Sequence, residues 1–169
     1  MDASGNYGWA KILDTNQGNG TGIALDASGN VYTTGSFSGS IDFDPSSANV
    51  YSYSSGSIDV FISKLDASGN YVWGKTMGGS RADIANSICL DASGNIYTTG
   101  YFNSSDADFD PSSGVAQLGT TGINDDDVFI SKLNASGNYV WAKKLGGPLS
   151  DIGRNIKVDA SGNVTEGTT

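Results

Sequence analysis

Alternating aspartates are the residues of this chain whose type and spacing could do chemistry. One loop carries three of them and another carries two: Asp106, Asp108 and Asp110, and Asp42 and Asp44. Alternating carboxylates can turn several oxygens toward one hard cation such as Ca²⁺, which takes about six to eight oxygen ligands. The alternative is that each Asp caps a turn while Phe43 and Phe109 anchor the loops. Ser40 stands where the shorter copy would need a third carboxylate. The glycine of EF-hand-like loops is missing as well, so we favour turn caps over a calcium site.

The usual catalytic groups are scarce. The chain has no His, which excludes His-based triads and imidazole metal ligands. Cys89 lies in an apolar segment, which predicts a buried thiol rather than a nucleophile, and a single Cys forms no internal disulfide. Paired Asp residues could act as glycosidase acids, but the spacing isolates no such pair, and Glu166 is the one Glu. We predict that the protein is not an enzyme and has no cofactor unless calcium binds, and a hydrolase is the less favoured alternative.

The charge of the chain limits its partners. The formal net charge is −9, which argues against nucleic acid and against anionic membrane surfaces, because both need a basic face. No apolar run approaches the ~18 residues of a membrane span, and no signal peptide is recognisable. All but one of the acidic residues are Asp, and Asp favours turns where Glu favours helices. Composition therefore predicts an all-β, turn-rich protein without membrane insertion.

A five-residue turn, Asp-Ala-Ser-Gly-Asn, recurs along the chain. Its copies are Asp2–Asn6, Asp26–Asn30, Asp66–Asn70, Asp91–Asn95 and Asp159–Asn163, with one variant, Asn134–Asn138. Asp caps such a turn through its side chain, and Gly takes the left-handed conformation that leads into the next strand. Its one carboxylate lacks partners at ligand spacing. We therefore predict a tight hairpin connection and no metal site in this motif.

Short and long gaps alternate between the copies, so the repeating unit contains two hairpins and four strands, a to d. These segments are rich in β-branched and aromatic residues and are bounded by turn signals. Strand a is predicted at Gly22–Leu25, Ser87–Leu90 and Asn155–Val158, strand b at Val31–Phe37 and Ile96–Phe102, strand c at Asp59–Leu65 and Asp127–Leu133, and strand d at Tyr7–Leu13, Tyr71–Met77 and Tyr139–Leu145. Four antiparallel strands followed by a step to the next four are typical of propeller blades.

The segments between these strands are predicted to be loops. Long loops, 38–58 and 103–126, join strands b and c, and the run Asp125–Asp127 predicts a solvated loop end. The Gly-rich segment Gly18–Gly22 enters strand a rather than a helix, so it predicts an inter-blade loop and not a phosphate-binding loop. The recurring Tyr-x-Trp pairs of strand d predict packing before sugar stacking, because they occupy one strand position in every copy.

Several of these spaced elements together resemble the SBBP-type β-propeller repeat. They are strand a, Asp-x-Ser-Gly-Asn, Tyr-x-Thr-Gly, Asp-Val-Phe-Ile-Ser-Lys-Leu and a Gly-Gly exit. The resemblance covers nearly the whole chain and implies β-propeller blades. It also implies a parent protein that is secreted or at the surface of a bacterium. It implies no particular activity, because propellers host many functions.

One segment, 1–169, is then predicted to hold about two and a half blades. Residues 1–13 would be strand d of a split blade, 22–77 and 85–145 whole blades, and 154–169 a partial blade. The last blade is degenerate, and Lys157 takes the position of Ala24 and Cys89, where packing favours a small residue. Because repeats need neighbours, we predict a non-catalytic structural protein that associates with itself head to tail, with a dimer favoured over a trimer. The alternative is a propeller that binds carbohydrate or another ligand with the loops at one face.

Overall fold

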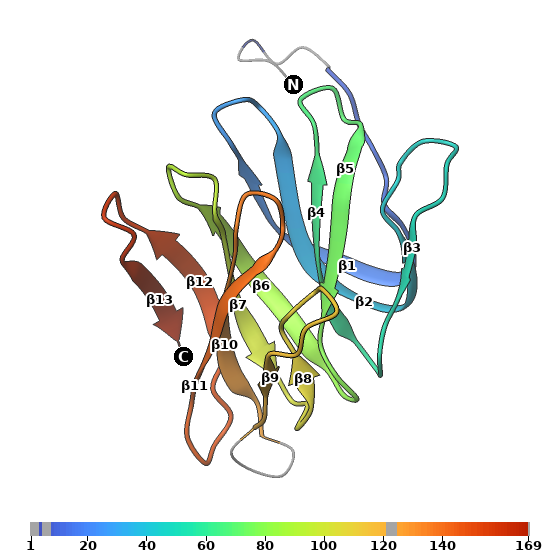
Figure 1. The fold of residues 1–169 in the computed structure, drawn as a ribbon. Helices are drawn as coiled ribbons and strands as arrows, with labels where there is room; N and C mark the ends of the chain where they lie inside the picture. The colour runs from blue at the N-terminus through green and yellow to red at the C-terminus, as the bar shows by residue number, and fades with distance from the viewer. Residues whose placement is uncertain (1–3, 5–7, 121–124, 169) are drawn as a thin grey trace.

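The computed structural model describes residues 4, 8–120 and 125–168 and shows an all-β protein (Figure 1). The strands are β1 Asp14–Leu25, β2 Val31–Asp42, β3 Tyr51–Tyr53, β4 Asp59–Leu65, β5 Tyr71–Met77, β6 Asp83–Leu90, β7 Ile96–Phe102, β8 Ala107–Asp108, β9 Gln117–Leu118, β10 Asp127–Leu133, β11 Tyr139–Leu145, β12 Gly153–Val158 and β13 Val164–Thr168. Within the described residues no helix is long and apolar enough to cross a membrane.

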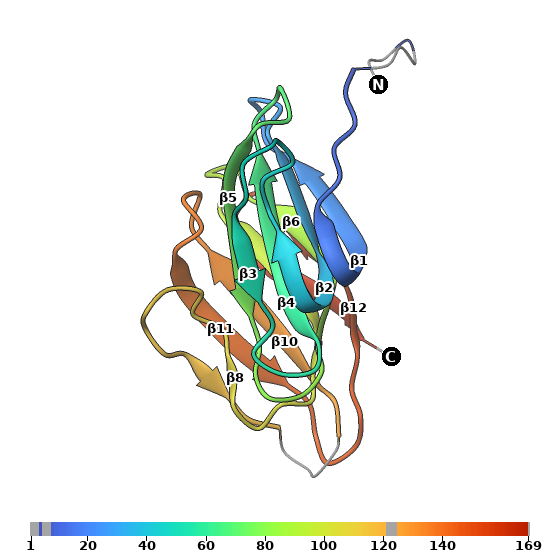
Figure 2. The same ribbon diagram turned by 90° about the vertical axis from the view of Figure 1, so that its right-hand side faces the viewer.

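Two antiparallel sheets follow each other in chain order. The first, blade 1, has the order β5-β4-β2-β1, with the short β3 added beside β2. The second, blade 2, has the order β11-β10-β7-β6, and the hairpin β12-β13 comes next as a third, two-stranded sheet. Figure 1 shows the three side by side from right to left, and in Figure 2 blade 1 is turned toward the viewer, with β5 on the left and β1 on the right. The predicted fold class, all-β with four-stranded blades, is confirmed.

The predicted strands c and d match β4, β5, β10 and β11 residue for residue. Strand a is longer than predicted in all three sheets, since β6 begins at Asp83 and β12 at Gly153. In blade 1 strand b is longer as well, because β2 continues to Asp42 and pairs with β1 from Asp14 onward. The Gly-rich segment Gly18–Gly22 therefore lies inside β1, and its prediction as an inter-blade loop is wrong. Parts of the predicted b–c loops also form strands, namely the end of β2 and the short β3, β8 and β9.

The strand predicted at Tyr7–Leu13 is not observed. Residues 8–13 lie outside every strand, and Tyr7 lies outside the described residues, as does the turn copy at Asp2–Asn6 apart from Ser4. The physical reason is the missing neighbour. A strand d pairs with a strand c, as β5 does with β4, and none of the described strands offers that edge to residues 8–13.

The main core lies between blades 1 and 2. Each blade has a leading face, turned toward the preceding part of the chain, and a trailing face, turned toward the next sheet. Blade 2 presents Ile88, Ile96 and Leu133 on its leading face, and blade 1 presents Tyr32 and Ile62 on its trailing face. All five side chains are buried in one cluster. A smaller cluster joins the trailing face of blade 2 to β12 in the same way, so the sheets stack like neighbouring blades of a propeller.

Candidate functional site

The recurring turn has the geometry predicted for it. Asp26 Oδ1 accepts hydrogen bonds from the backbone N–H groups of Ser28 and Asn30 at 2.9 and 3.0 Å. Asp26 Oδ2 accepts one from Asn30 Nδ2 at 2.8 Å. Gly29 has φ +80°, and its N–H donates to the Asp26 carbonyl at 3.0 Å. The turns that begin at Asp66, Asp91 and Asp159 repeat this pattern. The motif is a structural turn, as predicted.

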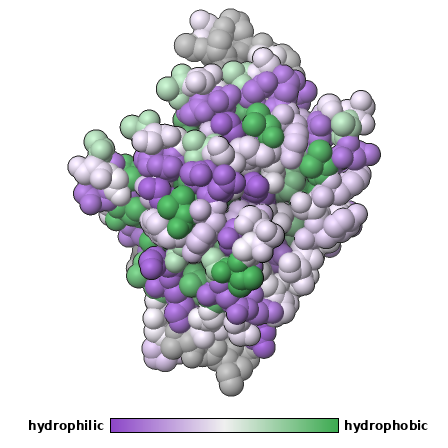
Figure 3. Space-filling model, in the orientation of Figure 1, coloured by the Kyte–Doolittle hydropathy of each residue, from purple (hydrophilic) through white to green (hydrophobic). Residues whose placement is uncertain are grey.

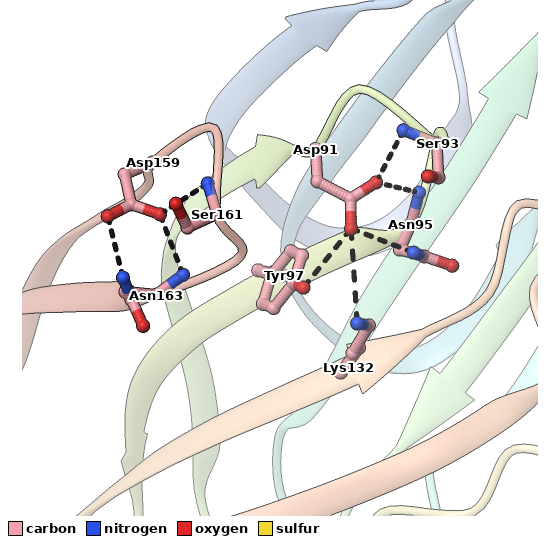
Figure 4. A network of polar contacts seen from close by, with 8 residues as sticks. All are labelled: Asp91, Ser93, Asn95, Tyr97, Lys132, Asp159, Ser161 and Asn163. Atoms are coloured by element: carbon pink, nitrogen blue, oxygen red, sulfur yellow. Dashed lines mark hydrogen bonds and ion pairs between the residues drawn. The ribbon is translucent and has the colours of Figure 1, made fainter.

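In the two whole blades the turn between strands a and b is also tied to the sheet. Tyr97 donates its hydroxyl proton to Asp91 Oδ2 at 3.2 Å, and Lys132 Nζ lies 3.9 Å from the same oxygen. Burial opposes ionisation, but the hydrogen bonds from Asn95 and Ser93 hold the pKa of Asp91 below its ordinary value. Figure 4 shows that Asp159 keeps only the local bonds of its turn. The reason lies in the register, because Thr165 stands where Tyr97 would.

This network predicts a graded response to substitution at Asp91. Asp91→Ala removes the acceptor of the turn N–H groups, and we expect it to lower the free energy of unfolding by about 1–2 kcal/mol. Asp91→Asn should lower it less, because in the variant turn Asn134 Oδ1 accepts the equivalent N–H groups, those of Ser136 and Asn138, both at 3.0 Å. Urea unfolding followed by tryptophan fluorescence measures both. Equal losses for the two variants would contradict the capping role.

The alternating aspartates close their own loops. Asp108 Oδ1 accepts hydrogen bonds from the N–H groups of Asp110 and Ala116 at 2.9 and 2.8 Å. Asp42 does the same in the first copy, with Asp44 and Val50 as donors. Asp44 and Asp110 in turn accept the N–H groups of Ser46 and Ser112, both at 2.9 Å. Each of these four carboxylates therefore caps a turn, as the favoured interpretation predicts.

Asp106 links the two blades instead. Its Oδ1 accepts hydrogen bonds from the N–H and the hydroxyl of Ser80 at 3.0 and 2.8 Å, and these bonds hold the pKa of Asp106 below its ordinary value. Beside it, Gly78 and Asp108 exchange two backbone hydrogen bonds at 2.9 and 3.0 Å. The loop of blade 2 is thus fastened to the segment that leaves blade 1. We name this set of contacts the inter-blade latch.

Phenylalanines anchor both loops, also as predicted. Phe109 is fully buried, with its ring centroid 4.7 Å from Phe129 and 5.6 Å from Phe102. Phe43 is buried in the same way, 6.3 Å from Phe61. Within the part of the chain that the structure describes, no group of three or more His, Cys, Asp or Glu side chains lies close enough together to hold a metal ion. Calcium binding by these loops stays a prediction.

A pair of buried carboxylates at the blade junction was not predicted. Asp59 and Asp83 are 1% and 0% exposed, and both point toward Gly78: a Cβ placed there would lie 2.6 Å from Asp59 Oδ1 and 2.9 Å from Asp83 Oδ2. Ser55 N–H donates to Asp59 Oδ2 at 2.7 Å, while Oδ1 has no hydrogen-bond partner. Burial, assisted by the charges of Asp83 and Asp106, raises the pKa of Asp59 to about 6. The Gly78-Gly79 pair that follows β5 has no side chains and therefore leaves space for these two carboxylates.

The prediction of a solvated loop end at Asp125–Asp127 is wrong for Asp127. That side chain is fully buried, and its Oδ2 lies 3.3 Å from Lys144 Nζ. It opens strand c, as Asp59 does in blade 1, and its carboxylate lies against the next Gly-Gly exit at Gly146. The signal was present in the sequence, because both strands c begin with the same Asp and both units end in Gly-Gly.

The junction also forms a polar hollow of about 190 Å³ that brings Asp59 together with Asp108 and Asp110. A carboxyl group whose pKa is near 6 has the acidity of a general acid. In this hollow, however, the carboxylates of Asp108 and Asp110 are engaged by loop N–H groups, and Asp59 is almost fully covered. These contacts favour a structural role over hydrolysis.

The remaining candidates for chemistry lie where blade 2 meets the β12-β13 sheet. Cys89 is half-buried there, and burial raises the pKa of its thiol to about 11. The thiol is therefore protonated at neutral pH and a poor nucleophile, as predicted. Glu166 lies on β13 with its carboxylate 3.5 Å from the Thr99 hydroxyl, and burial raises the pKa of Glu166.

The leading face of blade 1 is partly open and carries exposed apolar side chains. It borders a hollow of about 610 Å³ lined by Ile23, Leu25, Val31 and Leu65 on the sheet side and by Trp9 on the other. Ile23 and Leu25 are 66% and 63% exposed. The side of the molecule seen in Figure 3 carries separate hydrophobic patches set among hydrophilic residues. An open apolar sheet face suits binding of another protein surface, so this hollow is the best candidate for a functional site.

Comparison with known proteins agrees with this architecture. The chain is 27% identical over 148 residues to an uncharacterised WD repeat-containing protein of Acanthamoeba polyphaga mimivirus. That similarity covers 84% of this chain but 11% of the relative, so the chain spans about a tenth of the relative's length. No family model matches the chain, and the SBBP-type resemblance stays a prediction. The stacked sheets and this distant relative together indicate a repeat protein built of β-propeller blades.

Proposed function

We propose that the chain is a non-catalytic interaction scaffold, a run of blades that associates with other chains through its two ends. The observation that carries the proposal is the open apolar face of blade 1, with Ile23 and Leu25 more than half exposed. Soluble proteins seldom leave such a face uncovered without a partner, and stacked repeats gain stability from neighbours on both sides. The WD-repeat relative supports the same class of function.

The partner proposed for the edge of the β12-β13 sheet is a second copy, arranged head to tail. β13 pairs with β12 and with no other described strand, so one edge of this sheet is free to accept a strand. Residues 8–13 of a second copy, which have the strand d pattern, would pair with β13 directly, without a strand c between them. They keep an extended, unpaired path beside blade 1, where Trp9 Nε1 donates to the Ala67 carbonyl at 3.0 Å. A dimer is favoured over a trimer.

The solution mass tests this proposal. The chain has a mass of 17.4 kDa, and light scattering is expected to give about twice that value at micromolar concentration. A variant without residues 1–13 is the control, since it keeps both blades but lacks the donated strand, and should remain monomeric. A full-length chain that stays monomeric across the concentration series would contradict head-to-tail association. Placement outside the cell and binding of carbohydrate by the loops at one face stay predictions.

A further inference from the structure

The interface between blades 1 and 2 shows what the repeat uses to cover a leading face. The face of blade 2 is covered by four positions of blade 1: Ala24 on strand a, Tyr32 on strand b, Ile62 on strand c and Trp73 on strand d. Tyr32 and Trp73 meet edge to face, with ring centroids 6.1 Å apart. Beneath them Ile88 is 7% exposed. A small residue, a Tyr, an Ile and a Trp therefore form the covering set.

The same leading face on blade 1 is open at the corresponding positions. Ile23 pairs with Thr33 as Ile88 pairs with Thr98, so the two isoleucines are equivalent in register. Yet Ile23 is 66% exposed. The hollow of about 610 Å³ beside it lies where the covering set of another blade would sit.

One member of the covering set, the Trp, is already present on the leading face of blade 1 as Trp9. A Cβ at Gly69 would lie 3.0 Å from the Trp9 indole and 3.1 Å from Lys11 Cε. A Cβ at Gly137 would meet Trp73 and Lys75 at 3.2 and 3.1 Å. Trp9 therefore contacts blade 1 as Trp73 contacts blade 2. The missing members are the equivalents of Ala24, Tyr32 and Ile62.

The other end of this chain does not carry the missing members. Lys157 pairs with Thr165 where Ala24 pairs with Tyr32 and Cys89 with Tyr97. The side chains of Lys157 and Thr165 are both exposed, and the described part of this sheet consists of β12 and β13, neither of which supplies the isoleucine of a strand c. The tail of a second copy thus offers a charge and a small polar group to an apolar hollow.

We propose that the leading face of blade 1 binds the trailing face of another blade of this repeat, one that carries a small residue, a Tyr and an Ile at the positions of Ala24, Tyr32 and Ile62. The inference rests on the proposed scaffold function and names the partner of its apolar end. Such a blade belongs to a further run of repeats, and the much greater length of the relative agrees with such runs. The tail of an identical copy is the weaker partner for this face.

The test installs part of the covering set on the chain's own tail. In full-length protein, Lys157→Ala with Thr165→Tyr should tighten self-association at least tenfold relative to wild type, measured as the Kd by sedimentation. Adding Ile23→Lys and Leu25→Lys to the same chain should cancel the gain. Val115→Lys is the matched control: Val115 is 77% exposed on a loop, and its change should leave the gain intact.

Two results would overturn the inference: no tightening in the double variant, or a gain that survives lysines at Ile23 and Leu25. Every substituted residue is exposed, and far-UV circular dichroism confirms that each variant is folded. Lys157→Ala alone, expected to give a smaller gain, provides a second variant. The two proposals fail differently, since a monomeric wild type contradicts head-to-tail association, whereas a double variant no tighter than wild type contradicts the docking face.

Discussion

Ile88→Ala is expected to lower the free energy of unfolding by about 2–5 kcal/mol, which is the usual cost of emptying a buried isoleucine site. Ile23→Ala, the same change at the same strand position one blade earlier, is expected to change it by less than about 0.5 kcal/mol. The difference comes from the environment. Ile88 packs between two blades with its Cγ2 methyl beside Gly22 of β1, whereas Ile23 faces the open hollow.

Urea unfolding of the wild type, Ile88→Ala and Ile23→Ala measures this difference, at a concentration where each protein is monomeric. The comparison is well matched, since both residues are isoleucines paired with a Thr of strand b. Similar losses for the two variants would show that the face at Ile23 is covered in solution. Such a result would contradict the arrangement in which blade 1 covers the leading face of blade 2 and leaves its own leading face open.

Asp59→Asn is expected to raise the free energy of unfolding at pH 7 by about 1–3 kcal/mol, after allowance for solvent screening. The Asp59 pKa is raised from 3.8 to about 6 by burial and by the charges of Asp83 and Asp106. Between these two pKa values the folded state holds a proton that the unfolded state has lost. The contribution of Asp59 to stability therefore falls as pH rises from about 4 to about 6 and is level above that.

Asparagine does not titrate, so the gain should be large at pH 7 and small at pH 4. Its Oδ1 can still accept the Ser55 N–H. Asp66→Asn is the control, because hydrogen bonds from Asn70 lower the pKa of Asp66, and loss of that charge should not stabilise the protein at pH 7. An Asp59→Asn effect that is the same at both pH values would contradict a shifted Asp59 titration.

The fold was most predictable where a strand pattern lies directly beside a copy of the recurring five-residue turn. In the two whole blades the strands c and d are joined by a tight turn, and their bounds are correct to the residue. Strands a and b of blade 1 were predicted too short, because the extension of β2 to Asp42 is stabilised by pairing with a Gly-rich segment that has no strand signal of its own. Residues 8–13 have the residue pattern of a strand, but none of the described strands is available to pair with them. The sequence of the segment itself does not reveal whether such a neighbour exists.

The candidate site could be predicted only in part. The capping role of Asp42 and Asp108 follows from local turn chemistry, which a sequence displays. The burial of Asp59 and Asp127 follows from the neighbouring sheet and its glycines, so the prediction of a solvated loop end fails at Asp127. The open leading face is a property of stacking order, and no single segment displays it.

The inter-blade latch has a mechanical consequence. Its two backbone hydrogen bonds, between Gly78 and Asp108, join the exit of one sheet to the loop of the next. A force applied to the two termini would therefore act on these hydrogen bonds and on the apolar core between the blades at the same time. The two blades would separate only when both sets of contacts break. In a chain of such units, neighbouring blades would unfold together under tension rather than one at a time.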